Sequence, residues 1–155
     1  MTVPAPIIPG RVVTLQLGRI ALCEMLEEDQ KHFHEWLISN AELRTLIDDK
    51  RVPSFEDQLR WFRHSQGSDR KFFSIFVTDN SVSPVLIGNG GFVDIDKAQR
   101  TAVFRITIGH SAYIGKGYGS EAIRAFLSYG FTTLDFLEIT LRVLAKNERA
   151  LHAYE

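Results

Sequence analysis

The segment from Ile108 to Ser120 constrains the fold most, because it places a glycine-rich turn between a strand and a helix. Residues Thr101–Ile108 alternate as a β-strand does, and a helix is predicted from about Gly119 to Phe131. Alternating glycines permit a tight turn and present consecutive N–H groups at the positive end of the helix dipole. Such a turn favours a phosphate or pyrophosphate, with an ordinary strand-to-helix connection as the alternative.

The turn matches neither of two widespread nucleotide-binding motifs. Its glycines, Gly115, Gly117 and Gly119, alternate and lack the Gly-x-x-x-x-Gly-Lys-Ser/Thr spacing of a P-loop. The Gly-x-Gly-x-x-Gly dinucleotide fingerprint is absent as well, and the strands before the turn have the pattern of a meander. The glycines alone therefore indicate an anion site without identifying the anion.

The remaining pattern predicts one α/β or α+β domain, residues 1–155, with a layered sheet and a single core. Strands are predicted at Val12–Leu17, Ile20–Met25, Phe72–Thr78, Leu86–Val93, Thr101–Ile108 and Ile139–Leu144. Helices are predicted at Glu27–Ile38, after Ser54, at Gly119–Phe131 and from about Asn147. Two helical stripes support these assignments: Phe55, Leu59 and Phe62, and Ile123, Leu127 and Phe131.

Composition excludes several classes of protein. A formal net charge of -1 gives no basic field for nucleic acid, and no apolar run approaches the roughly 18 residues that cross a membrane. The N-terminus lacks a signal-peptide pattern, and Cys23 is the single cysteine, which fits the cytoplasm. We expect Cys23 to pack in a strand rather than to act as a nucleophile. His32 and His34 lack a third clustered ligand, so no metal site is expected.

Two motifs resemble the acetyl-CoA signatures of the GNAT superfamily of N-acetyltransferases. The first is Gly117-Tyr118-Gly119 followed by Ser120-Glu121-Ala122, and the second is Asn147-x-x-Ala150-x-x-x-Tyr154-Glu155. The resemblance covers roughly residues 20–155 and is strongest after residue 100. It implies a mixed, mostly antiparallel central sheet with helices on both faces. It also implies transfer of the acetyl group of acetyl-CoA to an amine, with no metal.

The resemblance assigns roles to particular residues. The coenzyme pyrophosphate would lie on the turn, and the pantetheine arm would pair with the strand before it like an added strand. The residues implied are Ile106, Thr107 and Ile108 for pantetheine, Gly115, Lys116, Gly117, Tyr118, Gly119 and Ser120 for the pyrophosphate, and Asn147 and Arg149 on the other side. Tyr154 would lie near the sulfur and protonate the leaving thiolate; packing of the last helix is its alternative role.

The chain departs from the superfamily pattern at two site positions. Ile114 stands where Arg or Gln is frequent, which removes one phosphate contact that Lys116 could replace. Val103 stands where polyamine-type relatives carry an acidic residue, so a carboxylate base is missing there. Asp94 and His110 are the substitute candidates for the general base, with solvated loop positions as the alternative for both.

The acceptor amine and the end of the chain give weaker expectations. Residues 36–40, 55–64 and 72–77 resemble enzymes that acetylate nucleotide-linked amino sugars, which makes such a sugar the favoured acceptor. Ribosomal-protein N-termini, polyamines and a non-catalytic acetyl-CoA-binding domain are the alternatives. Relatives continue past Tyr154-Glu155, so we expect a truncated domain that lacks its C-terminal strands. Residues 139–144 would then form an open edge through which a homodimer forms.

Overall fold

The computed structural model describes residues 8, 10–41, 43, 52–78 and 83–141. Its elements, in chain order, are β1 (Val13–Leu17), β2 (Ile20–Glu24), the 3-10 helix η1 (Glu27–Asp29), α1 (Gln30–Ser39), α3 (Phe55–His64), β3 (Lys71–Val77), β4 (Val85–Asp96), β5 (Thr101–Ile108), the 3-10 helix η2 (Ser111–Tyr113), α4 (Tyr118–Thr132) and β6 (Glu138–Leu141).

The strands form one six-stranded sheet in the order in which they occur along the chain. Neighbouring strands from β1 to β5 are antiparallel, and β6 then pairs with β5 in the parallel direction. The parallel pair requires a crossover, which α4 supplies. This mixed, mostly antiparallel sheet with an α4 crossover confirms the fold class expected from the sequence.

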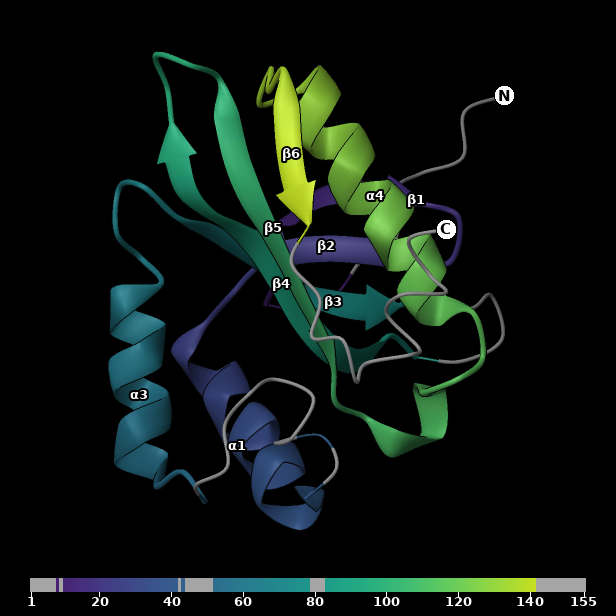
Figure 1. Ribbon diagram of the computed structural model, residues 1–155. Helices are drawn as coiled ribbons and strands as arrows, with labels where there is room; N and C mark the ends of the chain where they lie inside the picture. Colours follow the sequence, from purple (N-terminus) through teal and green to yellow (C-terminus); the bar gives the residue numbers. More distant parts are fainter. Residues whose placement is uncertain (1–7, 9, 42, 44–51, 79–82, 142–155) are drawn as a thin grey trace.

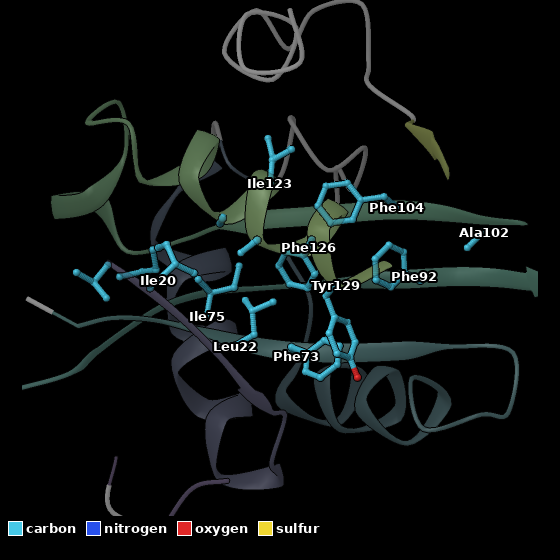
Figure 2. Close-up of a cluster of buried hydrophobic side chains, with 14 of the residues drawn as sticks. Ile20, Leu22, Phe73, Ile75, Phe92, Ala102, Phe104, Ile123, Phe126 and Tyr129 are labelled. Carbon is cyan, nitrogen blue, oxygen red and sulfur yellow. The ribbon is translucent and has the colours of Figure 1, made fainter. Parts of the chain in front are cut away.

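The larger core cluster lies between the sheet and α4 (Figure 1). Helix α4 contributes Ala122, Ala125, Phe126 and Tyr129, all at most 7% exposed, to this cluster. Figure 2 shows Phe126 and Tyr129 directed toward the phenylalanines of the sheet. The ring of Phe126 lies 5.2 Å from that of Phe104, and the rings cross at 47°. Burial of these aromatic surfaces is what fixes α4, and with it the preceding turn, against the sheet.

Helices α1 and α3 cover the opposite face of the sheet. Phe33 of α1 belongs to a second cluster that contains Phe72, Val93 and Val103. Trp61 of α3 packs on the same cluster, with its ring edge-on to Phe72 at 5.2 Å. Helices therefore lie on both faces, as expected, and the helix pair α1–α3 is separated from α4 by the sheet.

Two apolar stripes expected from the sequence are only partly buried. In α4, Ile123 is buried but Phe131 is 46% exposed, and in α3, Phe55 is 43% exposed. The α4 stripe Ile123, Leu127 and Phe131 advances in steps of four residues, each about 40° past a full helical turn, so two steps move Phe131 well off the core face. Phe55 is the first residue of α3. The buried stripe of α4 instead follows spacings of three and four residues, as a period of 3.6 requires.

Strand β4 runs further than the sequence predicted. The predicted strand ended at Val93, but β4 continues to Asp96. The register shifts between Val93 and Asp96, and Asp94 has φ 51°, as in a β-bulge. Aspartate tolerates this left-handed conformation better than most residues, so the bulge is compatible with its sequence.

Strand β6 is the outermost strand of the described sheet. It begins where the Leu137 amide donates to the Arg100 carbonyl at 2.7 Å, and its described pairing ends at Phe104↔Leu141. The expected continuation to residue 144 and the helix from about Asn147 lie outside the described residues. Self-association through this edge therefore stays a prediction.

Candidate acetyl-CoA site

The glycine turn follows β5 and leads directly into α4. Gly115 and Gly117 have φ of 75° and 87°, which side-chain-bearing residues rarely adopt, and Gly117 is the N-cap of α4. A Cβ built on either residue would meet no atom within 4 Å. Gly119 has an ordinary φ, and a Cβ there would come no closer than 3.9 Å to Ile108. Gly115 and Gly117 therefore face open space, whereas Gly119 lies next to Ile108 of β5.

At the start of α4, the amide groups have no recorded hydrogen bond to another described residue. The first recorded backbone hydrogen bond of the helix runs from the Glu121 amide to the Gly117 carbonyl at 3.2 Å. The amides of residues 118–120 precede that bond, and the positive end of the dipole of a 15-residue helix coincides with them. Lys116 is exposed within the turn and adds a full positive charge. The arrangement suits a pyrophosphate, as the sequence predicted.

A second basic residue at the turn was missed by the sequence analysis. Arg19, in the β1–β2 turn, places its guanidinium 4.2 Å from the centre of the Tyr118 ring. Its Nε donates to Glu121 Oε2 at 3.0 Å. The charge of Arg19 neutralises that of Glu121, the only carboxylate in the first turn of α4. The glycine turn therefore keeps the net positive charge of Lys116. The contact spans 102 residues of sequence, which is why no local pattern indicated it.

A row of aromatic rings connects α1 to the glycine turn. The ring centres are 5.8 Å apart for Trp36 and His110, 4.9 Å for His110 and Tyr113, and 5.2 Å for Tyr113 and Tyr118. Trp36 also lies against Gly109, where a Cβ would come within 2.5 Å of its ring. The row holds the end of β5, the turn and α1 in fixed relative positions.

The structure places His110 beside the turn but gives it a structural hydrogen bond. Its Nδ1 accepts from the Ala112 amide at 3.3 Å and caps η2. A neutral imidazole whose Nδ1 accepts carries its proton on Nε2, so the outer nitrogen is a donor. In this arrangement His110 must lose the Ala112 bond, or change tautomer, before it can take a proton from an amine.

Asp94, the other candidate base, lies away from the turn. It is exposed at the bulge of β4, beside the Val93↔Val103 pair and five residue pairs from Gly88↔Ile108. Five steps along a strand amount to roughly 17 Å. The structure therefore does not bring Asp94 together with the glycine turn.

The structure describes the residues predicted to bind pantetheine and the two positions that depart from the superfamily pattern. Ile106 and Ile108 pack against the α4 core, and Thr107 points to the other face. The described pairing of β5 with β6 stops at Phe104, so residues 105–108 lie beyond it. Val103 is 8% exposed in the α1–α3 cluster, and Ile114 is half-buried after η2. Asn147, Arg149 and Tyr154 lie outside the described residues.

Cys23 is fully buried, as its strand position indicated. It has 0% exposure beside Ala21, Phe76 and Ile8. Burial raises the pKa of its thiol from 9.0 to about 11. Burial disfavours the thiolate only in the folded chain, so the folded state is stabilised relative to the unfolded state as long as the thiol keeps its proton. This contribution to stability is fully present below about pH 9 and is lost as the pH rises through about 11.

We expect the Cys23 thiol to resist modification by a disulfide reagent in the native protein. At pH 8 a pKa two units higher lowers the thiolate fraction about a hundredfold, before any steric protection. The measurement is the rate of thionitrobenzoate release with and without unfolding concentrations of urea. Native protein that reacts as fast as unfolded protein would contradict the burial.

Other features of the described residues lie apart from the turn. His34 Nε2 is 2.8 Å from the Pro53 carbonyl oxygen, and His32 lies against Trp36. No cluster of three or more metal-ligating side chains occurs in the described part of the chain. Within the same part, no helix combines the length and the apolar character needed to cross a membrane. A cavity of about 300 Å³ opens at the far end of β2 and β3, near Glu24, Lys71 and the end of α3.

The sheet, the α4 crossover and the open glycine turn together define an acetyltransferase domain. The chain belongs to the GNAT acetyltransferase family, because the profile of the acetyltransferase (GNAT) domain matches residues 19–155. This match covers strands β2 to β6, both helical layers and both sequence motifs, and begins just after β1.

Individual relatives resemble parts of the chain. It is 39% identical over 62 residues to spermidine N(1)-acetyltransferase of Escherichia coli (strain K12), which is 40% of this chain and 33% of that protein. It is also 35% identical over 75 residues to the uncharacterized N-acetyltransferase p20 of Bacillus licheniformis. That alignment covers 48% of this chain and 40% of the p20 protein. The chain thus spans between a third and two fifths of the length of the curated relatives it matches.

Solved structures match over most of the chain. A spermidine N-acetyltransferase from Vibrio cholerae, solved in complex with CoA and spermine, superimposes with a TM-score of 0.75 at 25% identity. The match covers 88% of this chain and 78% of that one. A domain from Methanocaldococcus jannaschii has the same fold, with a TM-score of 0.75 at 16% identity.

Proposed function

We propose that this protein transfers the acetyl group of acetyl-CoA to a primary amine of a polyamine such as spermidine. The observation that carries the coenzyme part is the turn before α4, where three glycines leave the helix amides uncovered. The curated and structural relatives that act on spermidine or hold spermine support the acceptor. They favour the polyamine alternative over the amino sugar that the sequence analysis preferred.

In the proposed reaction a neutral amine attacks the thioester carbonyl carbon, the carbon–sulfur bond breaks, and the thiolate leaves. The acceptor must first lose a proton, since an aliphatic amine has a pKa of about 10. A β5 amide polarises the carbonyl, and the phenol of Tyr154 returns a proton to the sulfur. With Val103 in place of a carboxylate, water carries the amine proton away.

Substitution of Gly119 by valine tests the coenzyme site without straining the turn. Its backbone φ is ordinary and a Cβ has room within the protein, so the variant folds, whereas the branched side chain covers the helix amides. We expect acetyl-CoA affinity, measured by calorimetry, to fall at least about tenfold, or 1.4 kcal/mol. Ser128→Val, on the exposed side of the same helix, is the matched control.

The acceptor is tested by thiol release with spermidine, a nucleotide-linked amino sugar, an N-terminal peptide and no amine. Spermidine is expected to give the highest kcat/KM. A folded Gly119→Val variant with unchanged affinity would place the coenzyme elsewhere. Tight acetyl-CoA binding without release by any amine would leave the non-catalytic binding domain as the function.

A further inference from the structure

A polar row crosses the sheet on the face covered by α1 and α3. Ser74 pairs with Asn89, and Asn89 pairs with Thr107, so the three residues lie side by side on β3, β4 and β5. Paired residues share a face of the sheet. A Cβ on the neighbouring Gly90 would strike Phe126 of α4, which places Gly90 on the α4 face and Asn89 on the opposite one.

Two members of this row have no hydrogen-bond partner among the described residues. Ser74 Oγ donates to Asp29 Oδ2 at 2.6 Å. The side chains of Asn89 and Thr107 make no recorded hydrogen bond to any described residue, although both are half-buried. The only side-chain atom buried without a partner in the described segments is Gln16 Oε1. Within the described part of the chain, the polar ends of Asn89 and Thr107 are therefore partly exposed and free to bind another molecule.

The pair lies where an acceptor must approach. Thr107 belongs to the part of β5 beyond the described β6 pairing, and two residues later Trp36 stands over Gly109. Arg105 is exposed on the same face, about 7 Å along the strand. Val103 on this face is apolar and buried. The surface next to the thioester path therefore offers neutral acceptors and a cation, but no carboxylate on β5.

We propose that Asn89 and Thr107 bind the nitrogen of the acceptor amine in its neutral form. This inference rests on the proposed acetyltransferase function. Asn89 Oδ1 and Thr107 Oγ1 accept the amine N–H groups, which leaves the nitrogen lone pair for the thioester carbon. A carboxylate would favour the ammonium form, whereas neutral acceptors near Arg105 favour the free amine. By binding the neutral amine in preference to the ammonium ion, the pair supplies part of the effect that a base at position 103 would achieve by removing the proton.

Steady-state kinetics with spermidine test the pair. Removing one neutral hydrogen bond in Thr107→Val or Asn89→Leu is expected to raise the spermidine KM about three- to tenfold. The melting temperature stays at the wild-type value. The acetyl-CoA affinity stays unchanged as well, because the pantetheine arm would pair with the backbone of residue 107 and not with its side chain. Thr101→Val, at the other end of the same strand, is the matched control and leaves the KM unchanged.

Asn89→Asp separates binding from a structural role. A carboxylate there attracts the ammonium form, so we expect the spermidine KM to fall while kcat falls about tenfold, because a protonated amine has no lone pair for attack. Unchanged KM and kcat in both Asn89 variants and in Thr107→Val, with normal acetyl-CoA binding, would overturn the inference and leave the proposed function standing.

A direct binding measurement tests whether Asn89 and Thr107 bind the amine even if spermidine is not acetylated. The side-chain NH2 resonances of Asn89 are followed by NMR while spermidine is added to the protein saturated with CoA. A saturable shift that Thr107→Val weakens supports the pair, and the absence of turnover then counts against the proposed acceptor reaction alone. No shift at Asn89, with CoA bound, overturns the inference.

Discussion

Replacing Asp29 with alanine is expected to lower the free energy of unfolding by about 3–5 kcal/mol, because it leaves a buried cation without its partner. Asp29 is 1% exposed and accepts from Arg11 Nη1 at 2.7 Å, from Ser74 Oγ at 2.6 Å and from the Leu26 amide at 2.9 Å. The Arg11 side chain is only 8% exposed. The bond to Asp29 raises the pKa of Arg11, so its charge persists at every practical pH.

The measurement is urea unfolding followed by circular dichroism. Arg60→Ala serves as control, because Arg60 forms an ion pair with Asp57 while 65% exposed, and such surface pairs contribute about 0–1 kcal/mol. If Asp29→Ala fails to fold, the double variant Arg11→Met with Asp29→Leu removes both charges and is expected to recover most of the stability. If Asp29→Ala and Arg60→Ala lower the free energy of unfolding by equally small amounts, the buried Arg11–Asp29 pair does not stabilise the fold in the way proposed.

The same pair connects stability to the acceptor face. Asp29 begins the helical region of α1 and holds Ser74, the neighbour of Asn89 in the polar row. Arg11 is fixed in turn by Asp29 and lies over the Phe76 ring at 5.1 Å. The segment before β1 thus reaches the sheet face on which we place the acceptor amine. We therefore expect the loss of Asp29 to disturb acceptor binding more than coenzyme binding, because the proposed coenzyme site lies at the start of α4, on the other face of the sheet.

Local patterns were sufficient to predict the strands and the turn. The alternation in residues 101–108 predicted a strand with Phe104 and Val103 on opposite faces, and their packing in two different core clusters confirms this. The glycine spacing predicted a tight turn, and positive φ at Gly115 and Gly117 agrees with it. These features depend on chirality, side-chain alternation and backbone freedom, which neighbouring residues determine.

Features that depend on distant contacts were not predictable in this way. The Arg19–Glu121 pair joins a turn near the N-terminus to α4, and its sequence signal is a lone arginine after Gly18. The orientation of His110 depends on the Ala112 amide and on Trp36 from another helix. Asn89 gave no sequence signal because its proposed role depends on its register with Thr107 and on its lack of a hydrogen-bond partner among the described residues.

Replacing Tyr154 with phenylalanine is expected to lower turnover by about 10²–10⁴-fold, the usual range for a general acid. Tyr154 lies outside the described residues, so this prediction rests on its place in Asn147-x-x-Ala150-x-x-x-Tyr154. A phenol with a pKa of about 10 faces a thiolate whose conjugate acid lies near 8.5, so the transfer is uphill by only about 2 kcal/mol. Phenylalanine keeps the aromatic ring but lacks the phenolic proton, so the substitution tests only the protonation of the leaving thiolate.

The kinetic signature distinguishes an acid from a binding residue. We expect kcat and kcat/KM to fall together in Tyr154→Phe, while acetyl-CoA affinity by calorimetry stays within about twofold. Tyr129→Phe is the matched control, since Tyr129 is buried in the core between α4 and the sheet, with its ring edge-on to Phe73 (Figure 2). Wild-type turnover in Tyr154→Phe would remove the phenol from the mechanism, and the thiolate would then leave unprotonated, to be protonated by water. A large loss of acetyl-CoA affinity would instead make Tyr154 a binding residue of the last helix.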